Sequence, residues 1–209
     1  IEKSYYKNIF GTRRQNNIML TTTKLTTKKL ILTGMFTAII SIMAQITIHT
    51  QPIPFTLSFL AIFLTGIMLE PKCAFLAVLS YILLGAFGLP VFAGFRGGFH
   101  VISGMTGGYI IGYPLMALIT SISYQISIKL KPKRYFHNIV RTAILITGMV
   151  ASLAVDYLIG TLWFSFVSGS TIAYSLTVCV FPFVVFDLLK IALAVSFGTA
   201  IRKVVDRIT

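Results

Sequence analysis

The sequence predicts an all-α integral membrane protein with six transmembrane helices. Of its 209 residues, 56% are hydrophobic and only 11% are charged, whereas a soluble domain carries about 25% charged residues. The basic residues gather in clusters that are separated by apolar stretches long enough to cross a bilayer. The bilayer is therefore the expected solvent for most of the chain.

The net charge of +13 comes from eighteen Lys and Arg against five Asp and Glu, and an excess of this size is also typical of nucleic-acid-binding proteins. The positions of the basic residues argue against that class. Seven precede residue 30, five lie between 129 and 141, and three follow residue 201. Because these clusters flank apolar stretches, we expect loops on one side of a membrane and no nucleic-acid partner.

Six apolar stretches have the length of a membrane span, or of a helix that ends inside a protein-lined cavity. They cover residues 30–48, 56–70, 73–88, 107–128, 141–163 and 178–201. The second and third are joined by Glu70-Pro71-Lys72, so we expect a helical hairpin in which proline opens the second arm. A single kinked helix is the alternative.

The orientation follows from the charges. Six spans place sixteen of the eighteen basic residues on one side, which the positive-inside rule makes cytoplasmic. We expect a multi-pass protein of the cytoplasmic membrane with both termini in the cytoplasm. Residues 1–29 are expected to be a disordered basic extension, residues 30–203 a six-helix membrane domain, and residues 204–209 a short cytoplasmic tail. Met19 leaves open whether residues 1–18 belong to the mature protein.

A glycine-rich segment separates the third and fourth predicted spans. Residues 88–109 contain seven glycines interleaved with aromatic residues such as Phe92, a composition that disfavours a helix interior. The segment is also too apolar for an ordinary solvated loop. We expect an extracellular cap over a cavity, in which glycine lets the backbone approach a ligand and Phe92 forms an apolar wall. A glycine-rich turn that merely packs on neighbouring helices remains equally open.

The last predicted span contains Asp187 and Lys190, which share one helix face. They are either a mutually neutralising pair or part of a central site. In a site, Asp187 would accept hydrogen bonds from a donor-rich ligand head, and Lys190 together with Arg96 would favour a small amphipathic anion. Tyr157 and Trp163 are expected in an aromatic belt at the membrane surface, and Trp163 is alternatively a stacking wall. For Asp156 a structural and a functional role are about equally supported.

Nothing in the sequence indicates an enzyme. The three histidines are isolated and show no metal-ligand spacing, and the pair His100 and Ser103 lacks the third group that orients a catalytic base. No nucleotide-hydrolysing motif or cofactor signature is present. If the protein moves a solute uphill, the energy must come from a partner subunit or an ion gradient.

Five motifs in this order resemble the BioY family, the biotin-specific S components of energy-coupling factor (ECF) transporters. They are residues 85–94, Gly97-Gly98, residues 106–113, residues 160–163, and Pro182-Phe183 followed by Asp187-x-x-Lys190. The resemblance runs from about residue 30 to residue 203. It implies a protein that binds biotin from outside and associates with a transmembrane coupling protein and two ATPases.

The same resemblance implies which residues bind biotin. Asp187 and Lys190 match the family's acidic and basic pair, and Arg96 with Gly94 and Gly98 matches its glycine-rich binding loop. Which cation meets the biotin carboxylate stays open. The chain departs from the family at two positions: Ser58 stands where a Gln is usual, and Met105 replaces a usual proline.

Small residues at four-residue spacing, Gly34 and Ala38, resemble the motif by which S components dock on the coupling protein. Such a stripe lets another helix approach closely, either a neighbour within the bundle or a partner protein. Two alternatives stay within transport, namely a solitary biotin carrier and an S component for another small vitamin. A third alternative is a membrane-embedded enzyme or scaffold, which the missing catalytic constellation disfavours.

Overall fold

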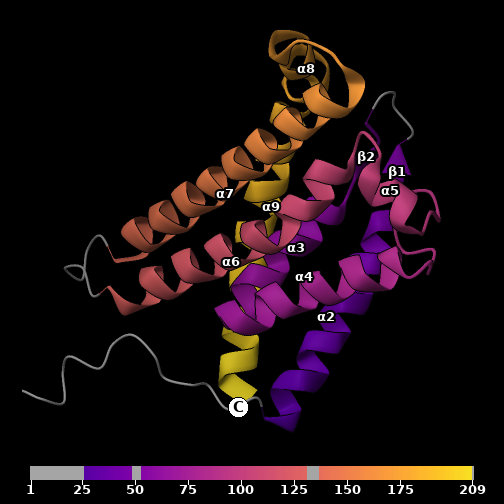
Figure 1. Cartoon of the computed structure of the whole chain (residues 1–209). Coiled ribbons are helices and arrows are strands. Elements are labelled where there is room, and N and C mark those ends of the chain that lie inside the picture. Colours follow the sequence, from indigo (N-terminus) through magenta and orange to yellow (C-terminus); the bar gives the residue numbers. More distant parts are fainter. Residues whose placement is uncertain (1–25, 49–52, 131–136, 209) are drawn as a thin grey trace, which may run out of the picture.

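The computed structural model describes residues 26–48, 53–130 and 137–208. This part of the chain is a helical bundle with one short two-stranded sheet (Figure 1). The helices in chain order are α2 (Thr27–Gln45), α3 (Ser58–Met68), α4 (Pro71–Ala86), α5 (Phe99–Ser103), α6 (Gly107–Lys129), α7 (His137–Ser168), α8 (Ile172–Cys179) and α9 (Phe181–Ile208). Strands β1 (Thr47–Ile48) and β2 (Phe55–Thr56) pair antiparallel, with Thr47 opposite Thr56.

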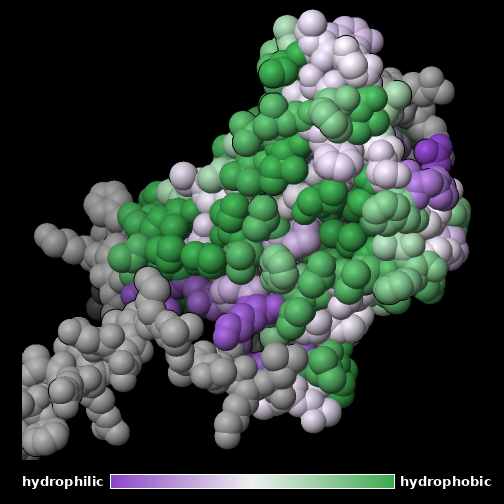
Figure 2. Space-filling model, viewed as in Figure 1, coloured by the Kyte–Doolittle hydropathy of each residue, from purple (hydrophilic) through white to green (hydrophobic). Residues whose placement is uncertain are grey.

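Within the described residues, four helices are long and apolar enough to cross a membrane: α2, α6, α7 and α9. Helices α3 and α4 are apolar but shorter. Many large hydrophobic side chains on the long helices are exposed, including Phe166, Val185 and Phe197. Figure 2 shows hydrophobic residues covering much of one face of the bundle, with hydrophilic ones near its lower and right-hand edges. An exposed apolar surface of this extent is what contact with lipid requires.

The hairpin predicted around Glu70 is present as two separate helices. Helix α3 ends at Met68, Leu69 and Glu70 are extended, and Pro71 occupies the first turn of α4. Proline is tolerated there because the first N–H groups of a helix have no partner within it. The single kinked helix is therefore not what forms.

The prediction of one uninterrupted helix from residue 178 was wrong at its beginning. Residues 172–179 form a separate short helix, α8, and α9 begins at Phe181. Pro182 lies in the first turn of α9, where its missing N–H costs least. Helix α7 is longer than the predicted 141–163, since it runs from His137 to Ser168.

The two ends of the bundle differ. At one end an ion pair joins Lys29 to Glu70 at 2.7 Å, and Arg202 donates to the carbonyl oxygen of Met68 at 2.7 Å. The start of α2 and the end of α9 therefore meet the α3–α4 junction. The opposite end carries β1, β2, α5 and α8 (Figure 1).

The predicted N-terminal extension and C-terminal tail lie partly outside the described residues. Residues 1–25 fall outside the described residues, and α2 already begins at Thr27. Residues 204–208 continue helix α9.

Candidate functional site

A buried ion pair marks the candidate site. Lys190 donates to Oδ1 of Asp187 at 2.7 Å, and the two side chains are only 6% and 3% exposed. Both residues belong to α9, where a spacing of three places them on the same face. Buried charges are stable only when they are paired and hydrogen-bonded. The side chains that pack around Asp187 and Lys190 must therefore supply partners for both charges.

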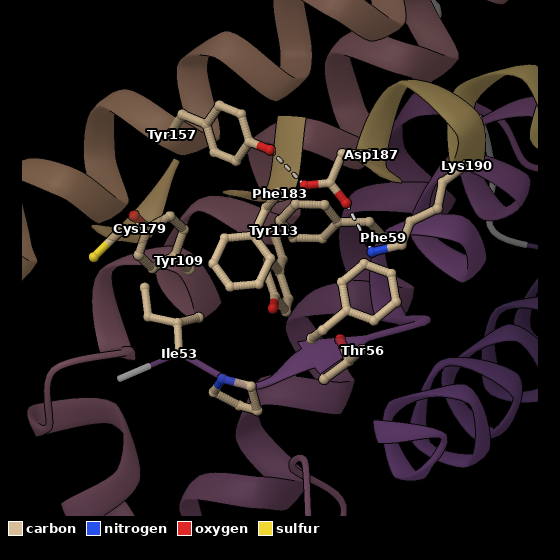
Figure 3. A pocket seen from close by; sticks show the side chains of 12 residues that line it. Ile53, Thr56, Phe59, Tyr109, Tyr113, Tyr157, Cys179, Phe183, Asp187 and Lys190 are labelled. Atoms are coloured by element: carbon tan, nitrogen blue, oxygen red, sulfur yellow. Dashed lines mark hydrogen bonds and ion pairs between the residues drawn. The ribbon is translucent and has the colours of Figure 1, made fainter. Parts of the chain in front are cut away.

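The surrounding helices complete the environment of the pair (Figure 3). Tyr157 of α7 donates a hydrogen bond to Oδ2 of Asp187, so both carboxylate oxygens have a partner. The ammonium group of Lys190 lies 3.9 Å from the ring centre of Phe55 and 5.3 Å from that of Phe59. The negative faces of these rings favour the cation. Residues from β2, α3 and α7 thus fix a pair that α9 supplies.

A cavity of about 390 Å³ opens beside the pair. Its wall is mostly aromatic and is formed by Ile53, Pro54, Phe55, Thr56, Phe59, Tyr109, Tyr113, Tyr157, Cys179, Phe183, Asp187 and Lys190. The ring of Phe59 meets that of Tyr113 edge to face, with the centres 5.5 Å apart. An apolar concavity with a few convergent polar groups is typical of small-molecule sites.

A second cavity, of about 580 Å³, adjoins the first. The two share five lining residues, which are Ile53, Pro54, Thr56, Tyr109 and Tyr113. The second cavity adds Arg96, Phe92 and Ser58 to the wall. Arg96 is exposed and forms no ion pair within the described residues. One elongated ligand could therefore meet the buried pair at one end and a guanidinium at the other.

The loop that carries Arg96 is held by Gln45 at the end of α2. Its side-chain amide donates to the carbonyl oxygens of Val91 and Phe92 at 2.9 and 3.2 Å, and its carbonyl oxygen accepts from the Phe95 N–H at 2.8 Å. Backbone hydrogen bonds also link Phe92 and Arg96 in both directions. Gln45 therefore fixes the path of the loop, and the sequence analysis did not single it out.

The predicted site residues separate into three groups. Asp187 and Lys190 line the first cavity, and Arg96 and Phe92 line the second. Gly94 and Gly98 line neither cavity, and instead have positive φ values of 71° and 103° that few other residues adopt. Their role in the loop is conformational.

Trp163 also lies outside the walls of both cavities. Its indole Nε1 donates to the carbonyl oxygen of Gly104 at 2.9 Å, and its Cβ packs closely on Gly108. Trp163 thus connects α7 to the end of the glycine-rich segment.

Several lining residues were missed. Tyr109 and Tyr113 lie four residues apart and so share a face of α6, a spacing that was visible in the sequence. Tyr157 was assigned to the aromatic belt at the membrane surface, yet its hydroxyl reaches Asp187. Phe55 and Phe59 carry no local signal that would place them over Lys190.

Asp156 is fully buried and lines neither cavity. Neither of its carboxylate oxygens has a hydrogen-bond partner among the described residues. It packs against Gly112 of α6, where a Cβ would collide with the carboxylate. Within the described residues, no three His, Cys, Asp or Glu side chains lie close enough to hold a metal ion.

Comparison with known proteins identifies the family. The model of the BioY family matches residues 16–207, nearly the whole chain. The chain belongs to the BioY family. The match begins earlier than the resemblance noted in the sequence, and it includes part of the predicted extension.

Relatives of this BioY-family protein cover most of its length. The biotin transporter BioY of Thermotoga maritima is 38% identical over 176 residues, which are 84% of this chain and 96% of the relative. The biotin transporter BioY2 of Lactococcus lactis subsp. cremoris is 32% identical over 182 residues, covering 87% and 92%. A multi-pass membrane protein is the architecture that these matches and the apolar helices support together.

A solved structure shares the fold. The S-component for biotin from an ECF-type ABC transporter, known from a crystal structure, superposes with a TM-score of 0.70. It is 26% identical in sequence, and the match covers 88% of this BioY-family chain and 95% of the other.

Proposed function

We propose that this BioY-family protein is the biotin-binding S component of an ECF-type transporter and mediates biotin uptake across the cytoplasmic membrane. The relatives carry the name biotin transporter, and the structural neighbour is an S component for biotin. The protein is a transporter component and not an enzyme. The observation that carries the proposal is the buried Asp187–Lys190 pair on the wall of an aromatic cavity that adjoins Arg96.

The chemistry of biotin matches this site. Its ureido head is rich in N–H donors, which the Asp187 carboxylate can accept. Its apolar thioether ring suits the rings of Phe59, Tyr109 and Tyr113. Its valerate carboxylate needs a cation, and the exposed Arg96 in the adjoining cavity supplies one. Biotin thus lies with its head at Asp187 and its carboxylate toward Arg96.

The glycine-rich segment 88–109 forms the cap of this site on the extracellular side. Phe92 and Arg96 reach the second cavity from it, and Gln45 and Trp163 hold its two ends by hydrogen bonds. Gly94 and Gly98 supply the backbone bends between these points. Movement of this cap admits biotin and then covers it.

The topology consists of six transmembrane helices, α2, α3, α4, α6, α7 and α9, with both termini in the cytoplasm. In support, Lys29, Glu70 and Arg202 meet at one end of the bundle, which gathers the basic start of α2 and the basic end of α9. Clustering of Lys and Arg on one side marks the cytoplasmic face. The membrane domain covers residues 30–203, between a basic extension and a short tail.

The partners are a transmembrane coupling protein and two ATPase subunits, and α2 is the docking helix. Gly34 and Ala38 are both exposed, and a Cβ at Gly34 would meet no atom within 4 Å. The outward face of α2 is therefore open to close approach by another helix.

Equilibrium binding of labelled biotin to the purified chain tests the proposal. Saturable binding is expected, with displacement by unlabelled biotin and no displacement by riboflavin or thiamine. Binding that is absent at micromolar biotin, or that another vitamin displaces more effectively, would contradict the assignment. Uptake by cells with and without an ECF module then separates an S component from a solitary carrier.

A further inference from the structure

Asp156 of α7 is a buried acidic residue that the proposed biotin site does not use. The side chain is fully buried, and neither carboxylate oxygen has a hydrogen-bond partner among the described residues. Both oxygens are also closed off from solvent. Ionisable side chains inside membrane spans are rare and are usually paired with one another or with backbone carbonyls, so an unpartnered one calls for a functional explanation.

The carboxyl group lies in the contact between α6 and α7, which run side by side (Figure 1). It packs on Gly112 of α6, where a Cβ would collide with Oδ1. One turn along α7, Gly160 packs just as closely on the ring of Tyr109. Contacts this close leave no space for a water molecule or a metal ion between Asp156 and α6. A proton is the one cation that needs no such space.

The titratable groups that act electrostatically on Asp156 include no cation among the described residues. They are Tyr109 and Tyr113 of α6, Tyr157 of α7 and Asp187 of α9. Lys190 of α9 is already bound to Asp187 at 2.7 Å. A negative charge on Asp156 would therefore be repelled by Asp187 without a compensating partner of its own.

This packing suits only the neutral form of Asp156. An isolated ionised carboxylate in apolar surroundings costs more free energy than a folded protein can offset, so a group of this kind takes up a proton instead. The neutral acid leaves only unsatisfied hydrogen-bonding groups, which is a much smaller cost. The close contact of α6 with α7 therefore depends on the proton.

We propose that Asp156 is a proton-binding site that controls the contact between α6 and α7. The carboxyl group holds a proton while the two helices pack as in the structure, and it releases the proton only when they separate. Separation would also change both biotin cavities, because Tyr109 and Tyr113 of α6 line them. Asp156 itself lines neither cavity, so the proton site does not depend on the biotin assignment.

Infrared spectroscopy of the full chain at neutral pH, in a maltoside detergent that has no carbonyl group, tests the site directly. The wild type should show the C=O stretch of a protonated carboxyl group, and Asp156→Asn should lose it. The double variant Asp187→Asn/Lys190→Met should retain it, which keeps the test decisive if Asp156→Asn does not fold. A wild type without this band, or its loss from the double variant, would overturn the proposal.

Transfer of the same samples to D2O tests whether the helix contact encloses the proton. The band of the wild type should shift slowly, whereas the band of a solvent-exposed acid would shift at once. Gly112→Ala, whose Cβ would collide with Oδ1, should speed this exchange, and Gly34→Ala, whose Cβ would enter open space, is the matched control. An immediate shift in the wild type, or equal rates in the two glycine variants, would show that the contact does not control the proton.

The pH dependence of thermal unfolding gives an independent measurement. An aspartate in the unfolded chain ionises near about pH 4, so above this pH unfolding releases the proton of Asp156. Each further pH unit then favours the unfolded chain up to about tenfold. From about pH 5 to about pH 8 the unfolding temperature of the wild type should therefore fall relative to that of Asp156→Asn. Parallel pH dependences would mean that Asp156 holds no proton in the folded chain, and would overturn the proposal.

Discussion

Neutralising Asp187 tests whether the buried pair binds ligand or only stabilises the fold. Asp187→Asn keeps the size of the side chain but removes the charge opposite Lys190, whose ammonium group lies 2.7 Å from Oδ1. Both side chains are almost fully buried, so water cannot replace the lost partner. The variant should therefore be destabilised and should also bind biotin weakly, and the single change does not separate the two causes.

The magnitudes can be worked out separately. Breaking a buried ion pair by removing one partner costs about 3–5 kcal/mol of folding stability, because the other charge stays buried and unpaired. A hydrogen bond to a charged acceptor is worth about 1.5–3 kcal/mol, which corresponds to roughly 10- to 150-fold in the dissociation constant. The double variant Asp187→Asn/Lys190→Met removes both charges, so it should recover most of the lost stability.

Two assays on the same samples give the answer. Thermal unfolding should show the double variant close to the wild type, whereas isothermal titration with biotin should show both variants weakened at least tenfold. Lys72→Gln, an exposed change outside the cavities, should alter neither measurement. If the double variant recovers biotin affinity together with stability, the pair is structural and the reasoning about Asp187 is refuted.

Three further predictions concern the cap and the docking face. Arg96→Gln should weaken biotin binding roughly 10- to 150-fold by loss of a charge-assisted hydrogen bond, yet leave the affinity for biotin methyl ester unchanged. An equal loss for the ester would show that Arg96 does not bind the biotin carboxylate. Gln45→Leu removes the side-chain hydrogen bonds to Pro90, Val91, Phe92 and Phe95. Hydrogen–deuterium exchange at residues 91–96 should therefore accelerate and biotin should dissociate faster, and unchanged exchange would contradict the role given to Gln45. The side chain introduced by Gly34→Leu would enter open space. The unfolding temperature and the biotin affinity should therefore stay unchanged, whereas co-purification with the coupling protein should be lost. Undiminished co-purification would show that this face of α2 is not the docking surface.

The helices were predictable because their signals are local. Apolar length, Pro71 and the clustered basic residues are each visible in a short window, and the observed α2, α3, α4 and α6 lie close to the expected ranges. The break before α9 was missed although Pro182 signals it, because the apolar run from residue 178 continues through the proline. Hydrophobicity alone does not show where a backbone N–H is absent.

The site was predictable only in part, for the same physical reason. A charge within an apolar span is conspicuous, so Asp187, Lys190 and Arg96 could be singled out from the sequence. Aromatic residues occur in every span, so nothing local distinguishes Phe55 or Phe59 from a lipid-facing ring. Their place in the wall depends on how α3, α6 and α9 pack, which is a property of the tertiary structure.

The contacts that Asp187 makes within the chain bear on the proposed binding of biotin. Each carboxylate oxygen can accept two hydrogen bonds, and the structure shows one on each oxygen of Asp187, from Lys190 and from Tyr157. The ureido N–H groups can therefore bind Asp187 without breaking either contact. The desolvation of both charges is already met when the chain folds, so binding does not incur it again. If Asp187 binds the ureido head as proposed, a rigid, prepaired carboxylate accepts its hydrogen bonds at a lower desolvation cost than a solvated one.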